Sequence, residues 1–179
     1  MTGPDRVRQA PTIATPITLH WFLPTNGDGR RLVEPDVPTP GVAGGLRPAT
    51  LDYLTQVASA AENLGFEGAL TPTGPWCDDA WVTTAALAQR TRRLKYIVAF
   101  RPGMVSPTLA AQMAATYQFH TGGRLILNVV TGGDSAEQQA YGDWLGKDDR
   151  YARCAEFLDV VRGLWAGDIV DLEGDHIRV

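Results

Sequence analysis

Apolar residues along the chain follow two patterns that alternate. Short continuous apolar runs are typical of buried strands, and longer stretches with apolar residues at every third and fourth position are typical of helices. Each expected strand is followed by an expected helix. The expected strands cover 17–24, 68–71, 94–100 and 125–130, and the expected helices cover 50–65, 80–90, 106–122 and 149–165.

Capping residues predict several of these helix boundaries. Thr50 precedes one apolar helix face and Gly65 follows it, in the positions of an N-cap and a C-terminal glycine. Ser106 with Pro107 predicts the start of another helix, because proline is favoured in the first turn, and Gly122-Gly123 predicts its end.

Three segments lie outside this alternation. Residues 1–16 lack the apolar core of a signal peptide and are expected to form a flexible leader, so the folded unit is expected to cover 17–179. Residues 25–48 are rich in glycine and proline and form a long predicted connection. Residues 169–172 and 176–179 are expected to pair as a C-terminal hairpin.

Four successive βα units predict an α/β fold with a parallel sheet and right-handed crossovers. Both a doubly wound sheet and a closed barrel give this alternation. A dinucleotide-binding sheet carries G-x-G-x-x-G after its first strand, whereas no predicted helix follows Asn26-Gly27-Asp28-Gly29. A (β/α)8 TIM barrel is therefore favoured. Since a complete barrel needs about 250 residues, the 179 residues are expected to form its N-terminal half.

Composition excludes several classes of partner. The net charge is −4, which does not suggest a nucleic-acid or anionic-membrane partner. No apolar run approaches the roughly 20 residues of a spanning helix. Cys77 and Cys154 are too few for a disulfide framework and indicate a reducing compartment, the cytoplasm; Cys154 is expected to pack in the core.

Several short motifs lie at the ends of expected strands or at the starts of helices. In this order they resemble the N-terminal half of alkanesulfonate monooxygenases, within the bacterial luciferase-like flavin-dependent monooxygenase family. The motifs are Trp21-Phe22-Leu23-Pro24-Thr25 with Gly27-Asp28-Gly29, Pro72-Thr73-Gly74 with Cys77, Asp79, Ala80 and Trp81, Arg101-Pro102, Ser106-Pro107-Thr108, Gly123-Arg124, Asn128-Val129-Val130-Thr131-Gly132, and Arg150-Tyr151 with Glu156-Phe157.

The resemblance implies a two-component enzyme that uses FMN as FMNH2, together with O2, to cleave an alkanesulfonate to an aldehyde and sulfite. It implies an NAD(P)H-dependent flavin reductase as a partner and a homo-oligomeric enzyme. An arginine and a histidine near the sulfonate, and the main flavin-phosphate loops, are expected beyond Val179. The isolated 179-residue chain is therefore expected to have no monooxygenase activity and negligible affinity for FMN.

Cys77 is the candidate catalytic residue. It lies between an expected strand and an expected helix, where a helix N-terminus can lower the pKa of a thiol. The resemblance implies that this thiol hydrogen-bonds flavin or an oxygen intermediate. The alternative is a small residue that fills a loop. Nucleophilic catalysis requires an adjacent base, and the nearby sequence offers only Asp78 and Asp79.

The resemblance also implies cofactor contacts at Thr73, Asn128, Thr131 and Tyr151. Amide and hydroxyl groups at strand ends suit the polar edge of a flavin ring. They also satisfy loop backbone, and the spacing of Tyr151 fits a core position as well. Related enzymes carry a histidine where this chain has Lys147, which weakens the expected role of Tyr151.

Arg101 and Trp21 are the candidate substrate-binding residues. A guanidinium suits the three oxygens of a sulfonate, although a solvated arginine at a loop edge is the alternative. Trp21 can pack beside the flavin or belong to the core. At position 26, alkanesulfonate enzymes tend to have histidine and this chain has Asn26. No metal site is expected, because His20, His120 and His176 lack neighbours at ligand spacing.

Three readings remain open. The first is the FMNH2-dependent alkanesulfonate monooxygenase. The second is a deazaflavin-dependent oxidoreductase, or a monooxygenase of another sulfur compound, within the same superfamily. The third is a non-catalytic remnant that associates with another chain.

Overall fold

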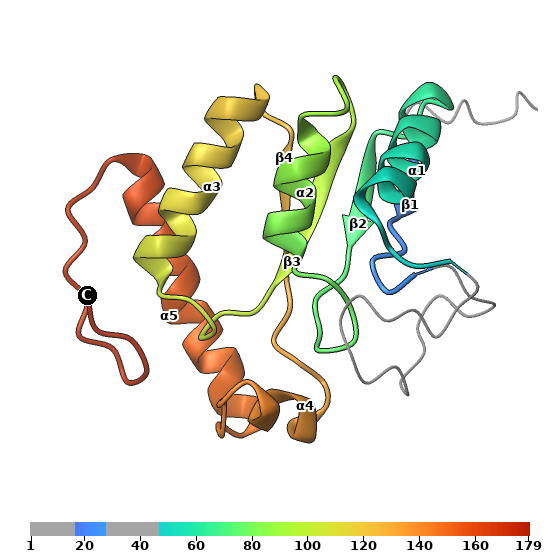
Figure 1. Cartoon of the computed structure of the whole chain (residues 1–179). Helices are drawn as coiled ribbons and strands as arrows, with labels where there is room; N and C mark the ends of the chain where they lie inside the picture. Colours follow the sequence, from blue (N-terminus) through green and yellow to red (C-terminus); the bar gives the residue numbers. More distant parts are fainter. Residues whose placement is uncertain (1–16, 28–46) are drawn as a thin grey trace, which may run out of the picture.

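The protein is described by a computed structural model of residues 17–27 and 47–179. Its centre is a parallel four-stranded sheet in which the strands follow chain order. This order confirms the four predicted βα units (Figure 1). The strands are β1 (His20–Phe22), β2 (Gly68–Thr71), β3 (Lys95–Phe100) and β4 (Leu125–Val129).

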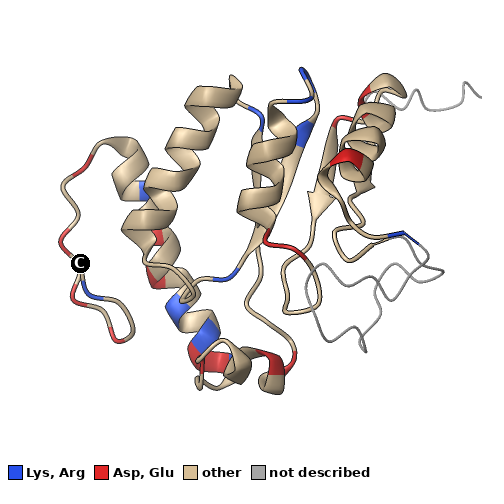
Figure 2. Cartoon of the chain, viewed as in Figure 1, with Lys and Arg blue, Asp and Glu red and all other residues tan. Residues whose placement is uncertain are grey.

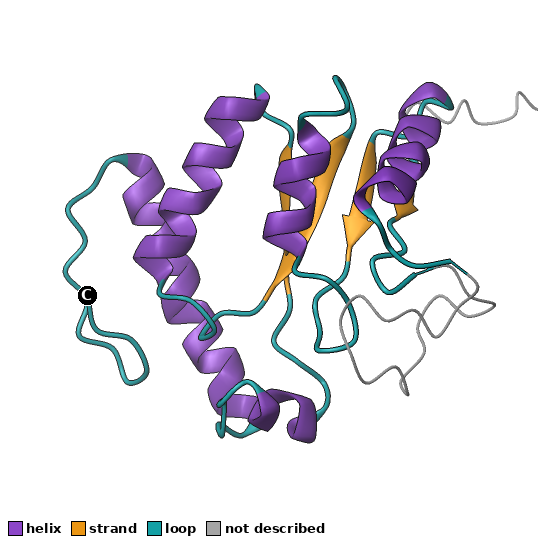
Figure 3. Cartoon of the chain, in the orientation of Figure 1, coloured by secondary structure: helices purple, strands orange, loops and turns teal. Residues whose placement is uncertain are grey.

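Helices α1, α2 and α3 cover one face of this sheet, and α5 lies against α3 (Figure 3). The short helix α4, which the sequence analysis did not predict, lies beyond the carboxyl end of β4. The helices are α1 (Leu51–Asn63), α2 (Ala80–Ala88), α3 (Pro107–Thr121), α4 (Ser135–Ala140) and α5 (Lys147–Ala166).

Capping bonds confirm the predicted helix ends. The side chain of Thr50 accepts a hydrogen bond from the Tyr53 amide at 3.2 Å, and Ser106 accepts one from Leu109 at the same distance. Gly122 ends α3 with φ of +66°, a left-handed conformation that glycine adopts without steric cost.

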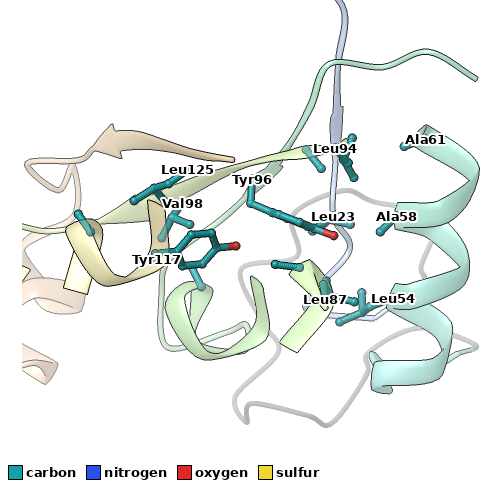
Figure 4. Close-up of a cluster of buried hydrophobic side chains, with 14 residues drawn as sticks. Leu23, Leu54, Ala58, Ala61, Leu87, Leu94, Tyr96, Val98, Tyr117 and Leu125 are labelled. Carbon is teal, nitrogen blue, oxygen red and sulfur yellow. The ribbon is translucent and has the colours of Figure 1, made fainter. Parts of the chain in front are cut away.

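The core lies between the sheet and α1 to α3 (Figure 4). Register places Ala69, Tyr96 and Leu125 side by side on the face toward the helices, and all three are buried. The Tyr96 hydroxyl lies 2.9 Å from that of Thr91, and the Tyr117 hydroxyl donates to a backbone carbonyl of α2. Both phenol groups are therefore buried with hydrogen-bond partners, as a stable core requires.

The opposite face of the sheet carries a row of half-buried apolar side chains, because no described helix covers it. Adjacent positions in the register place these side chains side by side, as the interior of a barrel requires. The row consists of Phe22, Leu70, Ile97 and Ile126.

The two edge strands differ from expectation. The strand predicted over 17–24 covers three residues, and Ile17 and Leu19 are 85% and 59% exposed. In β4, whose apolar run is typical of a buried strand, only Leu125 is buried. Within the described residues each edge strand pairs on one side only, so apolar composition predicted strands here but not their burial.

The predicted C-terminal hairpin is shorter than expected. Leu172 and Val179 exchange two backbone hydrogen bonds, and Glu173 and Arg178 form an antiparallel bridge. Residues 169–171 do not pair, and Ile169 is fully exposed. The carboxylate of Glu156 on α5 instead holds this turn by accepting three of its backbone N–H groups.

In the same way, the carboxylate of Glu62 on α1 holds the turn between α2 and β3. Its Oε2 accepts from the backbone N–H groups of Arg92, Arg93 and Leu94 at 2.9, 2.6 and 2.8 Å. Burial raises the pKa of Glu62, but these three bonds and the Arg93 charge outweigh it and leave the pKa below its ordinary value of 4.5.

We expect Glu62→Gln to lower the free energy of unfolding at pH 7 by about 1 kcal/mol. Because the folded-state pKa lies below the unfolded value, ionised Glu62 stabilises the fold above pH 4.5, and this contribution is lost as pH falls through the folded pKa. Urea unfolding of both proteins at pH 7 and at pH 3 measures the difference. A difference that stays constant with pH would contradict this assignment.

Candidate active site

The carboxyl ends of β2 and β3 open into a pocket of about 400 Å³. In Figure 1 the carboxyl ends of the strands point toward the side of the molecule on which α4 lies. Loops converge there because parallel strands end at one edge. The residues that the following paragraphs use are Thr73, Cys77, Asp78, Trp81, Arg101 and Tyr141.

Cys77 is buried in this pocket, and its thiol donates to the Gly74 carbonyl at 3.5 Å. Burial raises the pKa of the Cys77 thiol to about 11, and the charge of Asp78 raises it further. The expectation that a helix N-terminus lowers this pKa is therefore wrong. The first turn of α2 is already capped by Asp79, whose side chain accepts from Val82 at 2.8 Å.

Arg101 lies at the end of β3, and its side chain is only 6% exposed. Its Nη2 donates to Oε1 of Glu137 at 2.7 Å and to the Thr73 carbonyl at 3.2 Å. Its guanidinium carbon lies 5.5 Å from the centre of the Tyr141 ring. Arg101 is therefore a buried, paired cation and not the solvated residue that was its alternative.

Two nitrogens of the Arg101 guanidinium, Nε and Nη1, have no hydrogen-bond partner among the described residues. Both are shielded from solvent. Buried N–H groups of this kind are costly unless an acceptor meets them. Arg101 lines the pocket, and these two nitrogens are donors that still lack an acceptor in the described part of the chain.

The acid that pairs with Arg101 comes from α4, an element that sequence reasoning missed. Asp134 caps α4 by accepting from the Glu137 amide at 2.8 Å. An acidic cap followed three residues later by glutamate is a helix-start signal that the sequence does contain. Tyr141 follows the same helix, so α4 supplies both the carboxylate and the ring that contact Arg101.

Two arginines of α5 hold the segment that carries α4. Arg150 is buried and donates to the carbonyls of Thr131, Gly132 and Leu145. Arg153 pairs with Asp143 at 2.5 Å, and this bond lowers the pKa of the Asp143 carboxyl despite burial. The segment between β4 and α5 is thus tied to α5 through charged hydrogen bonds.

The predicted site residues separate into two groups. Thr73, Cys77 and Arg101 line the pocket together, as expected from their places at strand ends. Asn128 and Thr131 are half-buried and Tyr151 is 56% exposed, and these three lie outside the lining of this pocket. The side chain of Asn128 shares the open face of the sheet with Ala99, its partner in register.

Trp21 also lies outside the pocket lining. It pairs in register with Ala69 and packs edge-on against Phe66, with ring centroids 5.2 Å apart. This position is on the helix-covered face of the sheet, but the Trp21 side chain is 48% exposed and does not belong to the buried core.

No group of three potential metal ligands occurs among residues 17–27 and 47–179. Both cysteines are free and buried. Within the same described ranges, no helix is both long and apolar enough to cross a membrane.

The raised pKa predicts a poorly reactive Cys77. At pH 8 we expect its alkylation by iodoacetamide to be at least about tenfold slower than that of an unshielded cysteine with a pKa near 8.5, since only the thiolate reacts. The rate is expected to increase steadily up to pH 10. Peptide mass spectrometry distinguishes Cys77 from Cys154. Rapid labelling of Cys77 at pH 7 would refute the neutral thiol.

A sequence model of the family described as luciferase-like monooxygenase matches residues 17–179. Among solved structures, EDTA monooxygenase from Chelativorans sp. BNC1 is similar with a TM-score of 0.74 and 23% identity, over 90% of this chain and 44% of the other.

Two further solved structures share the fold. The oxygenating constituent of 3,6-diketocamphane monooxygenase from Pseudomonas putida, in complex with FMN, gives a TM-score of 0.69 at 16% identity, over 90% of this chain and 43% of that one. The coenzyme F420-dependent tetrahydromethanopterin reductase from Methanopyrus kandleri gives 0.69 at 17%, over 92% and 45%. The chain spans less than half the length of each of these proteins.

Proposed function

Because the chain belongs to the luciferase-like monooxygenase family, we propose that it forms part of the active site of a two-component, reduced-flavin-dependent monooxygenase. The observation that carries this proposal is the convergence of Thr73, Cys77 and Arg101 on one pocket at the carboxyl ends of β2 and β3. In barrels of this kind, chemistry takes place at that end of the strands.

The pocket has features that fit a flavin. Trp81 and Phe100 give it apolar walls, and Thr73 and Cys77 add polar groups to its lining. A flavin ring combines an apolar body with a polar edge, and such a wall suits it. We propose FMN as the cofactor; bound in reduced form, it supplies electrons for the reaction with O2.

Cys77 and Thr73 are the pocket residues that we assign to the flavin, with Asn128, Thr131 and Tyr151 as contacts from neighbouring segments. With a pKa near 11, the Cys77 thiol remains protonated at neutral pH. It therefore acts as a hydrogen-bond donor in an enclosed site and not as a nucleophile.

For the substrate we propose an alkanesulfonate, cleaved to an aldehyde and sulfite. Arg101 is the residue that binds the sulfonate, because its unpartnered nitrogens match oxygen acceptors. A monooxygenase of another sulfur compound is the nearest alternative. The similarity of the fold to a coenzyme F420-dependent reductase keeps a deazaflavin cofactor as a second candidate.

The partners that we propose are a flavin reductase and further copies of the chain, in the cytoplasm. Support for self-association comes from α2 and α3, which carry no Asp, Glu, Lys or Arg (Figure 2). Protein interfaces are depleted in charged residues at their centres.

The test is sulfite release by the full-length protein from linear alkanesulfonates, with FMN, a flavin reductase, NAD(P)H and O2. We expect turnover that requires each component, and Arg101→Lys to raise KM by about tenfold, because lysine offers a different donor geometry. Asp159→Asn, in an exposed ion pair with Arg162, is the control. Turnover only with reduced deazaflavin would favour the second candidate, and no turnover with either cofactor would favour a non-catalytic remnant.

A further inference from the structure

Glu137 is the residue through which the segment after β4 acts on Arg101. Its carboxylate is the anionic partner of the buried guanidinium, at 2.7 Å, and its side chain is 20% exposed. The contact joins α4 to the end of β3, two elements that are separate in sequence.

The ion pair occupies only one nitrogen of the guanidinium. Nη2 is used by Glu137 and by the Thr73 carbonyl, whereas Nε and Nη1 have no partner among the described residues. Because the guanidinium is planar and rigid, fixing Nη2 at two acceptors also restricts the directions of the other N–H groups.

Gly74 provides the space for this arrangement. A Cβ at position 74 would lie 2.8 Å from Oε1 of Glu137, the same oxygen that accepts from Arg101, and 2.4 Å from the Trp76 ring nitrogen. The Glu137 carboxylate therefore lies against the Gly74 backbone, where a methyl group would displace it. Tyr141, after the same helix, lies over the guanidinium.

From this geometry we propose that Glu137 is a positioning residue that sets the orientation of Arg101 for an anionic substrate group. The inference rests on the proposed function, because that function supplies the anionic group that would accept hydrogen bonds from Nε and Nη1 of Arg101. Glu137 acts by accepting a hydrogen bond in a fixed place, so an isosteric acceptor can replace it. If Glu137 acted only by neutralising the charge of Arg101, its negative charge would be required and glutamine could not replace it.

The test compares Glu137→Ala, Glu137→Gln and Gly74→Ala in the full-length protein. We expect Glu137→Ala to raise KM for an alkanesulfonate by at least about tenfold, with kcat within about threefold of wild type, as for loss of a charged hydrogen bond that orients a binding group. Glu137→Gln keeps the acceptor oxygen, so its KM should stay within about threefold of the wild-type KM. Gly74→Ala should raise KM without any change of charge.

Asp159→Asn removes an acid from an exposed ion pair and is the matched control, with thermal unfolding measured for every variant. If Glu137→Ala does not fold, Glu137→Gln and Gly74→Ala still decide the matter. An unchanged KM in Gly74→Ala, or a Glu137→Gln variant as impaired as Glu137→Ala, would overturn positioning by Glu137.

A second readout does not depend on the sulfonate reaction. The ¹⁵Nε–H resonance of Arg101, assigned with Arg101→Lys, should exchange slowly with solvent in the wild type and in Glu137→Gln, and faster in Gly74→Ala. If wild type releases no sulfite but shows this pattern, the proposed function fails and the positioning role of Glu137 stands. Equal exchange in all three proteins overturns the positioning role itself.

Discussion

The parallel direction of the four strands is the constraint on which the pocket depends. Because β1 to β4 run the same way, their carboxyl ends lie at one edge, and the segments that follow β2, β3 and β4 meet there. Helices α1 to α3 cover one face and keep the strands in register through a core around Tyr96. Residues far apart in sequence, such as Cys77 and Arg101, thus line one pocket.

Charged hydrogen bonds hold the segment between β4 and α5 in place beside the carboxyl ends of the strands. The segment between β4 and α5 has little apolar core of its own, and buried arginines organise it through backbone carbonyls and carboxylates. A buried guanidinium is expensive to desolvate, so each needs several acceptors in defined places. That requirement makes the segment specific in shape. It also links Arg150 on α5, through the segment that carries α4, to Arg101 in the pocket.

Two glutamates on helices hold turns in place away from the pocket. Glu62 and Glu156 each accept hydrogen bonds from three successive backbone N–H groups, Glu62 from the turn between α2 and β3 and Glu156 from a turn in the segment that follows its own helix. The backbone N–H groups of such a turn are not paired by strand or helix hydrogen bonds. One carboxylate can accept hydrogen bonds from all three of them. The helices of this fold therefore contribute polar anchors as well as apolar faces.

The sequence by itself determined the alternation of strands and helices, the helix caps at Thr50 and Ser106, and the location of Thr73, Cys77 and Arg101 at strand ends. These features depend on local periodicity and local hydrogen bonds, which neighbouring residues encode. Only the tertiary structure decided that the Cys77 thiol has a raised pKa, that Trp21 packs on Phe66, and that Glu137 pairs with Arg101. Burial, electrostatic environment and partners distant in sequence arise from packing, because they depend on which elements come together in space.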